Sequence, residues 1–173
     1  MRKRTTKKIL RDNLNRSSPL KDHFVLWLHN IRSLHNVGAI FRNADAFGVH
    51  KLFLSGFTPC PPRPEITKTA IGAEEHVQWE YADDIKQKAE ALKKDGYILT
   101  GLEQADRSVM LQNYSIRSSR ICLVLGNEVT GIDAEMLHLL DDAVEIPQFG
   151  MKHSLNVSVA SGVALYGFLQ KLQ

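Results

Sequence analysis

Three short stretches of the sequence set polar side chains where they could hold a ligand and act on it. In the first, Arg42 follows Asn36 by six positions and lies among apolar residues. In the second, Gly126–Gly131 places a carboxylate between two glycines, where the backbone can approach a ligand closely. In the third, a loop closes on Ser154 and Asn156 just before an apolar helix, whose free N–H groups favour anionic or electron-rich ligands.

Each stretch also has an ordinary structural interpretation. Arg42 could extend its charged end from a packed helix to water. Glu128 could complement the dipole in the first turn of a helix, or pair with a cation such as Arg42. Ser154 is a good N-cap, and capping alone would explain it. The elements that position these residues must therefore be considered next.

The hydrophobic pattern predicts six strands that alternate with helices. The run 121–125 is apolar throughout, as is typical of a strand buried on both faces. Residues 37–47 repeat apolar side chains at helical spacing and end at Gly48, which is suited to stop a helix. Strands are expected at 23–29, 51–54, 77–81, 97–102, 120–125 and 143–146. Helices are expected at 37–47, 65–73, 83–94, 133–140 and 155–172, with irregular loops at 55–64 and 104–119.

This alternation predicts an α/β fold in which a parallel sheet is flanked by helices on both faces. Ligands of such sheets bind outside the carboxyl ends of the strands. Because the three polar stretches each follow an expected strand, they should meet at that edge. We expect residues 1–20 to be a short basic N-terminal extension and residues 21–173 to be one domain.

Composition narrows the class of protein. Apolar residues make up 43% and charged residues 24%, as in an ordinary globular protein. No apolar run is long enough to span a bilayer, and no apolar segment marks a secretory signal. Cys60 and Cys122 are far apart, and the seven histidines lack ligand-like spacing, so we expect neither a disulfide nor a metal site. A reducing compartment, the cytoplasm, is the expected location.

The N-terminus is strongly basic. Residues 1–16 carry seven basic side chains against Asp12, a net charge of +6, whereas the whole chain carries only +3. A basic arm on a slightly acidic body is typical of contact with a nucleic-acid backbone, although a solvated terminus without a partner has the same composition. The candidate RNA-binding residues are Arg2, Lys3, Arg4, Lys7, Lys8 and Arg11.

Several common ligand motifs are absent from the sequence: GxGxxG, GxxxxGK[ST] and GxSxG. Instead, Asn36–Arg42, Leu125–Gly131, and Ile146-Pro147 with Ser154–Ala160 closely resemble, in order and spacing, three motifs of one family. That family is the SpoU/TrmH-like RNA 2′-O-ribose methyltransferases of the SPOUT superfamily, and the resemblance covers roughly residues 23–171.

The resemblance implies a C-terminal deep trefoil knot, a homodimer, and S-adenosylmethionine bound in a bent shape largely by backbone groups. It assigns Arg42 to the ribose 2′-hydroxyl, with Asn36 in support. It also places Glu128, Ser154 and Asn156 in the active site. The cofactor contacts it implies are Thr100, Gly101, Leu102, Gly126, Asn127, Ile146, Gln148, Met151 and Leu155.

The implied reaction is an in-line attack of a ribose 2′-hydroxyl on the sulfonium methyl group, which requires the hydroxyl to be held close and aligned. A guanidinium stays protonated at ordinary pH and has no free acceptor lone pair, which argues against a simple general base. We expect Arg42 to stabilise the developing alkoxide and to orient a neighbouring phosphate. Deprotonation of Arg42 in a strongly perturbed site is the alternative.

The substrate is expected to be tRNA or rRNA. A non-catalytic RNA-binding or ribosome-associated protein that keeps the fold is the second interpretation of the same motifs. A SPOUT enzyme that methylates a base is disfavoured by the Asn36–Arg42 spacing.

Overall fold

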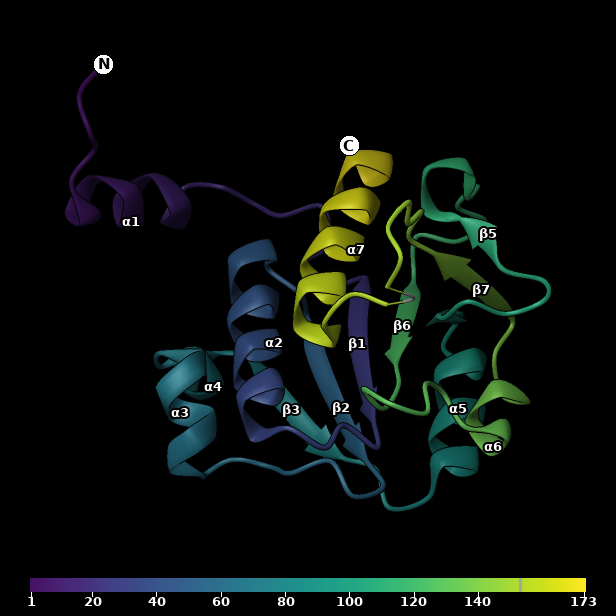
Figure 1. The fold of residues 1–173 in the computed structure, drawn as a ribbon. Coiled ribbons are helices and arrows are strands. Elements are labelled where there is room, and N and C mark those ends of the chain that lie inside the picture. Colours follow the sequence, from purple (N-terminus) through teal and green to yellow (C-terminus); the bar gives the residue numbers. More distant parts are fainter. Residues whose placement is uncertain (153) are drawn as a thin grey trace.

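The computed structural model describes residues 1–152 and 154–173 and forms a seven-stranded sheet covered by helices on both faces (Figure 1). Every strand pair in the sheet is parallel, and the strand order is β3-β2-β1-β6-β4-β7-β5. The strands are β1 Phe24–His29, β2 Lys51–Ser55, β3 Gln78–Tyr81, β4 Ile98–Leu102, β5 Val109–Met110, β6 Ile121–Leu125 and β7 Asp142–Glu145. The helices are α1 Thr6–Leu14, α2 Leu34–Phe47, α3 Pro64–Ala70, α4 Ala73–His76, α5 Ile85–Lys94, α6 Ala134–Leu137 and α7 Val157–Leu172, with a 3₁₀ turn at Leu111–Asn113.

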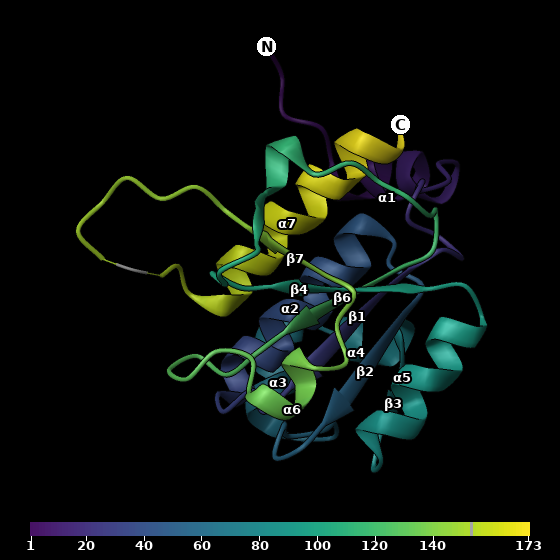
Figure 2. The ribbon, with the colours of Figure 1, turned by 90° about the vertical axis from the view of Figure 1, so that its right-hand side faces the viewer.

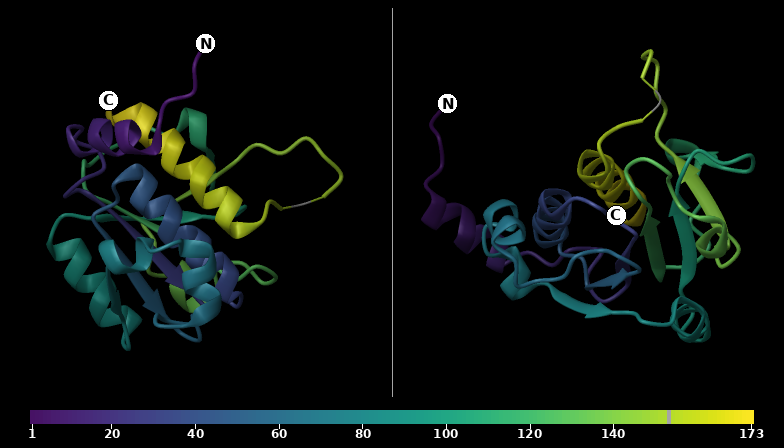
Figure 3. Two further views of the ribbon diagram at one scale, coloured as in Figure 1. Left: turned by 90° about the vertical axis from the view of Figure 1, so that its left-hand side faces the viewer. Right: turned by 60° about the horizontal axis from the view of Figure 1, so that its bottom comes forward.

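The central strand β1 explains the layers, because its side chains alternate between two cores. Phe24, Leu26 and Leu28 are fully buried and belong to the core under α2, α3 and α7. Val25 and Trp27 point to the opposite face and join the core under α5 and α6. Figure 3 shows α2 and α7 on one side of the sheet and α5 on the other. The predicted parallel sheet with helices on both faces is confirmed.

The predicted loop 104–119 is wrong in part, because it contains β5 and the 3₁₀ turn. The segment is mostly polar, but Leu111 and Tyr114 are only 6% and 7% exposed and pack in the core. The parallel neighbours β4 and β6 are therefore connected through β5 and the 3₁₀ turn, without a crossover α-helix. The predicted helix 133–140 is also shorter in the structure, where α6 ends at Leu137.

Helix α2 starts earlier than expected and positions the first polar stretch. Its N-cap is Ser33, whose hydroxyl accepts a hydrogen bond from the N–H of Asn36. It ends at Gly48 with φ +67°, as predicted for a glycine stop. One side of α2 packs on α7 and the other on α3 and α4. Gly38 lies on the second side, and a Cβ there would meet the backbone oxygen of Ile66 at 2.3 Å.

Two segments stand away from the body. The basic helix α1 has no buried residue and lies apart from the sheet and its covering helices (Figures 1 and 3). The connection from β7 toward α7 also extends outward over residues 146–152 (Figure 2). Most of both segments is exposed, although Ile146 at the start of the second packs against the core.

Candidate active site

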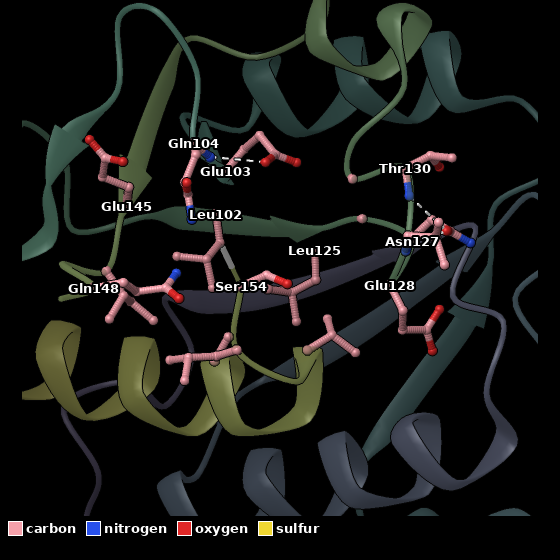
Figure 4. Close-up of a pocket in the computed structure, with 17 residues that line it drawn as sticks. Leu102, Glu103, Gln104, Leu125, Asn127, Glu128, Thr130, Glu145, Gln148 and Ser154 are labelled. Carbon is pink, nitrogen blue, oxygen red and sulfur yellow. Dashed lines mark hydrogen bonds between the residues drawn. The ribbon is translucent and has the colours of Figure 1, made fainter. Parts of the chain in front are cut away.

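A cavity of about 340 Å³ opens at the carboxyl ends of β4, β6 and β7, beside the N-terminus of α7 (Figure 4). This is the edge at which a parallel sheet is expected to bind ligands. The volume suits a small organic molecule. Apolar side chains come from Leu102, Leu125, Val129, Ile146, Leu155, Val157 and Ala160, and polar ones from Glu103, Gln104, Asn127, Glu128, Thr130, Glu145, Gln148 and Ser154.

The turn after β6 is held by its own asparagine. Asn127 and Gly131 exchange two backbone hydrogen bonds of 3.0 Å, and Asn127 Oδ1 accepts from the N–H groups of Val129 and Thr130. The Asn127 Nδ2 group donates to the carbonyl of Asn30 at 2.8 Å, which ties the turn to the end of β1. The turn is therefore rigid in the absence of a ligand and presents its backbone to the cavity.

Glu128 caps the N-terminus of α2. Its carboxylate accepts hydrogen bonds from the N–H of Arg32 at 2.9 Å, the N–H of Ser33 at 3.0 Å and Asn36 Nδ2 at 2.8 Å. Of the contacts that the sequence allowed for Glu128, the described residues show none with Arg42, and Glu128 does not lie in the first turn of the following helix, because α6 begins at Ala134. The sequence pattern could not predict this contact, because α2 begins nearly one hundred residues earlier in the chain.

The hydrogen bonds set the charge state of Glu128. Desolvation raises its pKa, but donation from the Arg32 N–H, the Asn36 amide and the Ser33 N–H outweighs burial, so the pKa lies below the ordinary value. The carboxylate therefore stabilises the fold above the unfolded-state pKa of about 4.3, and this stabilisation is lost as the pH falls through the lower folded-state value.

We expect Glu128→Gln to lower the free energy of unfolding at neutral pH by about 2 kcal/mol, because charge-assisted hydrogen bonds become neutral ones. Near pH 3 the difference from the unmodified protein should shrink. Urea unfolding at both pH values measures it, with the exposed Glu90→Gln on α5 as the control. A difference that is the same at both pH values would contradict the role of the ionised carboxylate.

Asn36 joins all three polar stretches. Its Nδ2 donates to Glu128, and its Oδ1 accepts from Asn156 Nδ2 at 3.0 Å. Asn156 in turn accepts from the N–H groups of Ser158 and Val159 through Oδ1. The chain of contacts Glu128–Asn36–Asn156 thus starts at the cavity lining and connects the starts of α2 and α7.

The N-cap of α7 is Asn156, so the predicted N-cap role of Ser154 is wrong. The helix begins at Val157, two residues later than the sequence indicated. Ser154 is exposed and lines the cavity. Both residues are good caps by type, and only the contact with Asn36 selects Asn156.

Arg42 lies on α2 outside this hydrogen-bonded chain. Its side chain is exposed, whereas Asn43 faces α7 and donates to the carbonyl of Ser158 at 2.7 Å and to the hydroxyl of Ser161 at 2.8 Å. Within one copy of the chain, the described residues give Arg42 neither a hydrogen bond nor an ion pair. Its guanidinium is therefore available to an added phosphate or hydroxyl.

Six of the residues proposed as cofactor contacts line the cavity: Leu102, Gly126, Asn127, Ile146, Gln148 and Leu155. Thr100 and Gly101 are buried in β4 below it, where the Thr100 hydroxyl lies 3.5 Å from the Tyr114 hydroxyl. Met151 is 97% exposed on the outward connection and is not part of the lining.

Glu103 and Glu145 also line the cavity and were not singled out from the sequence. Glu103 directly follows β4 and Glu145 ends β7, so their position at the carboxyl ends of strands could have marked them as candidate site residues. The Glu103 carboxylate accepts from the N–H of Ile132 at 2.8 Å and holds the far end of the Asn127 turn. Together they give the cavity a negative rim.

The basic arm forms a helix but keeps its charges in solvent. Thr5 caps α1 by accepting from the N–H of Lys8, and Arg4 pairs with Asp12 at 3.0 Å. Arg2, Lys3, Lys7 and Arg11 are exposed. Within residues 1–152 and 154–173, no helix is long and apolar enough to cross a bilayer. The same residues contain no cluster of histidine, cysteine or acidic side chains that could hold a metal ion.

A family model, the SpoU rRNA Methylase family, matches residues 23–166. The chain belongs to this family. It is 33% identical over 170 residues to a tRNA (guanosine(18)-2′-O)-methyltransferase of Thermus thermophilus, covering 96% of this chain and 84% of the relative. It is 34% identical over 139 residues to the enzyme of the same description from Escherichia coli, covering 80% of this chain and 59% of the relative. A relative of the same description from Saccharomyces cerevisiae is 33% identical, and the match spans only 9% of it.

Solved structures agree with this assignment. The A. aeolicus TrmH/SpoU tRNA modifying enzyme superimposes with a TM-score of 0.80 at 29% identity, covering 95% of this chain and 81% of the other. An AdoMet-bound rRNA methyltransferase from Sinorhizobium meliloti superimposes with a TM-score of 0.82 at 26% identity, and the match covers 95% of this chain and 60% of the other. The resemblance to SpoU/TrmH-like proteins is confirmed for nearly the whole fold.

Proposed function

We propose that this protein is an S-adenosylmethionine-dependent methyltransferase that acts on a ribose 2′-hydroxyl of RNA. The observation that carries the proposal is the Glu128–Asn36–Asn156 chain, which starts at Glu128 in the cavity lining. It brings together the three stretches that resemble the family motifs, from distant parts of the sequence. The same contacts also stabilise the fold, so it is the adjoining cavity, suited to a small organic molecule, that favours the enzyme over a non-catalytic RNA-binding protein.

The cavity fits the proposed cofactor in size and in charge. Bound there, S-adenosylmethionine would supply an electrophilic methyl group on a positively charged sulfur. The apolar side chains of Leu102, Ile146 and Leu155 offer a surface for the adenine ring, and the free backbone near Gly126 offers hydrogen bonds to its edge. The carboxylates of Glu103 and Glu145 complement the positive charges of the molecule.

The site residues would divide the work of the reaction. Arg42 would hold the phosphate beside the target ribose and stabilise the negative charge that develops on the 2′ oxygen. Asn36 would keep α2 in register with Glu128 and Asn156, and Ser154 would face the ribose from the cavity wall. Alignment of the hydroxyl with the methyl group is the main contribution expected of such a site.

The experiment that tests the function begins with calorimetry using S-adenosylmethionine. Single-turnover methylation of tRNA and rRNA follows, with mass mapping of the modified nucleotide. We expect micromolar binding of the cofactor and one methyl group on a ribose. Absence of cofactor binding would favour the non-catalytic interpretation, and a methyl group on a base would contradict the proposed atom.

Transfer RNA is the substrate favoured by the relatives, since several of them are described as tRNA (guanosine(18)-2′-O)-methyltransferases. A relative from Coxiella burnetii, 30% identical, is described as a 23S rRNA methyltransferase, so rRNA is the alternative. We propose residues 21–173 as the methyltransferase domain and the cytoplasm as its location, which suits its two free cysteines.

The C-terminal knot is also part of the proposal. Ile146 and Gln148 after β7, and Ser154 and Leu155 before α7, line the same cavity as the turn 126–131, and α7 packs on α2. This proximity of the C-terminal segment to an earlier loop supports the knot. Knotted chains are rare exceptions among folds.

A homodimer is supported by the exposed face of α7. Val159, Val163 and Tyr166 are 53%, 42% and 56% exposed, and their spacing of four and three residues places them along one side of the helix. Such an apolar stripe marks an interaction site on an otherwise polar surface.

We expect the double change Val159→Glu and Val163→Glu to convert the dimer to a monomer in light scattering, because like charges would face each other across a two-fold axis. Gln170→Glu, exposed on the same helix, is the control. A single-copy mass for the unmodified protein would contradict the dimer.

The basic helix α1 is proposed to bind the RNA backbone outside the active site. Deletion of residues 2–16 should weaken RNA binding at least tenfold at low salt and flatten the dependence of affinity on salt concentration, because fewer counterions are released. Filter binding over a salt series measures both. Changing the exposed Lys86 and Lys94 of α5 to alanine is the control. An unchanged slope after the deletion would mean that the arm does not touch RNA.

A further inference from the structure

An exposed aromatic ring lies at the carboxyl end of β2. The side chain of Phe57 is 62% exposed, two residues after the strand ends at Ser55. Single exposed apolar side chains are common and require no explanation by themselves. Phe57 differs because the turn that carries it is fixed, and because it is joined to the proposed active site.

Four contacts fix the turn. Asn30, in the left-handed region with φ +57°, accepts from the N–H of Phe57 through Oδ1 at 3.1 Å. The Tyr81 hydroxyl donates to the carbonyl of Gly56. The Thr58 hydroxyl donates to the Leu28 carbonyl at 3.1 Å and accepts from the N–H of Ile31 at 3.0 Å. The ring is therefore held out into solvent by a rigid support, which lowers the entropy lost on binding.

The same asparagine connects Phe57 to the cavity. The carbonyl of Asn30 accepts from Asn127 Nδ2 at 2.8 Å, and the Asn30 side-chain amide donates to Asp133 at 2.8 Å. Two residues further, the N–H of Arg32 donates to Glu128, while the Arg32 side chain is exposed. The segments that carry Phe57 and Arg32, two exposed side chains, are therefore both tied by hydrogen bonds to the neighbourhood of the Asn127–Glu128 turn.

We propose that Phe57 stacks on an unpaired nucleobase next to the ribose that is methylated, with Arg32 contacting the adjoining phosphate. The proposal rests on the proposed function and adds a contact for the RNA. Exposed aromatic rings beside positive charge are how proteins hold single-stranded RNA, and stacking accepts any base because each has a π-face. The site would thus require an unpaired nucleotide without reading its identity.

The first test compares Phe57→Ala with Phe57→Tyr. Loss of a base–aromatic stack should raise the Kd for RNA by between about fivefold and 150-fold, with the same rise in KM. Cofactor affinity and kcat at saturating RNA should change little, and Phe57→Tyr should restore binding. Ile71→Ala removes another exposed apolar side chain, 67% exposed near α3, and serves as the control.

The second test observes the ring directly. Phe57→Trp places an indole on the fixed turn, and its fluorescence should be quenched by a mixed-sequence single-stranded RNA oligonucleotide. The same strand in a duplex should quench little, because its bases are already stacked and paired. The response of the unmodified protein to the same RNA, which comes from the buried Trp27 and the half-buried Trp79, is subtracted.

Unchanged RNA affinity in Phe57→Ala, or equal quenching by duplex and single strand, would overturn the proposal. A change of mass in light scattering would assign Phe57 to a contact between copies instead, and a fall in cofactor affinity would assign it to the support of the cavity. Failure of the unmodified protein to methylate RNA would contradict the proposed function, whereas the RNA affinities would still decide the role of Phe57.

Discussion

Arg42→Ala should reduce the single-turnover rate of methyl transfer by about a thousandfold while the affinity for S-adenosylmethionine stays within a few-fold. The loss follows from removing the cation that stabilises the developing alkoxide, and single charge-stabilising donors are worth about 10²–10³ in rate. Cofactor affinity should survive because Arg42 is exposed on α2 and lies outside the cavity lining. Calorimetry and a rapid-mixing assay with tRNA measure the two quantities.

The control for Arg42 is Asp45→Ala, which removes an exposed charge from the same helix and should leave the rate unchanged. A large loss of cofactor binding in Arg42→Ala would show that the arginine is structural. A fully active Arg42→Lys would exclude both a guanidinium that grips phosphate in two places and a guanidine that acts as a base. The pH–rate profile then distinguishes a stabilising charge from a base, since a base makes the rate rise with its own deprotonation.

Gly126→Ala should lower the free energy of unfolding by about 3 kcal/mol and remove measurable cofactor binding. A Cβ at this position would lie 2.4 Å from the carbonyl carbon of Gly131 and 2.4 Å from the nitrogen of Ile132. These are backbone atoms of the same rigid turn, so the turn must open to make room, and overpacking of this kind is at the costly end of its range. Urea unfolding and calorimetry test both effects.

Gly150→Ala is the matched control, because a Cβ at Gly150 meets nothing within 4 Å. It should leave stability and cofactor binding as they are. Normal cofactor binding by Gly126→Ala would mean that the turn after β6 is not the wall of the cofactor site. Loss of stability without loss of binding would separate the packing of the turn from its role in the cavity.

The sequence predicted the layered architecture because burial leaves a strong local pattern. The run 121–125 is apolar on both faces, and every residue of β6 is buried between two cores. Gly48 predicted the end of α2 because only a left-handed residue closes that helix. The prediction of an irregular loop at 104–119 was wrong in part. The strand β5 is only two residues long, and the nearby Leu111 and Tyr114 are buried by contacts distant in the sequence.

The cap of α7 shows why local pattern is insufficient at the site. Ser154 and Asn156 are both suitable N-caps by residue type, so the sequence alone could not choose between them. The choice depends on Asn36, whose oxygen accepts from Asn156 across the gap between α2 and α7. The role of Glu128 likewise could not be read from its neighbours in the sequence, since its three hydrogen-bond donors lie at the start of α2.

The sequence by itself therefore determined the parallel sheet, the edge at which a ligand would bind, and the family to which the chain belongs. Apolar periodicity and motif spacing are properties of residues close together in the sequence, so they can be recognised without the three-dimensional structure. Only the tertiary structure decided that Glu128 caps α2, that Asn36 joins the three stretches, and that Arg42 stands free on an exposed face. Such contacts join atoms within about 3 Å that are far apart along the chain, and only packing brings them together.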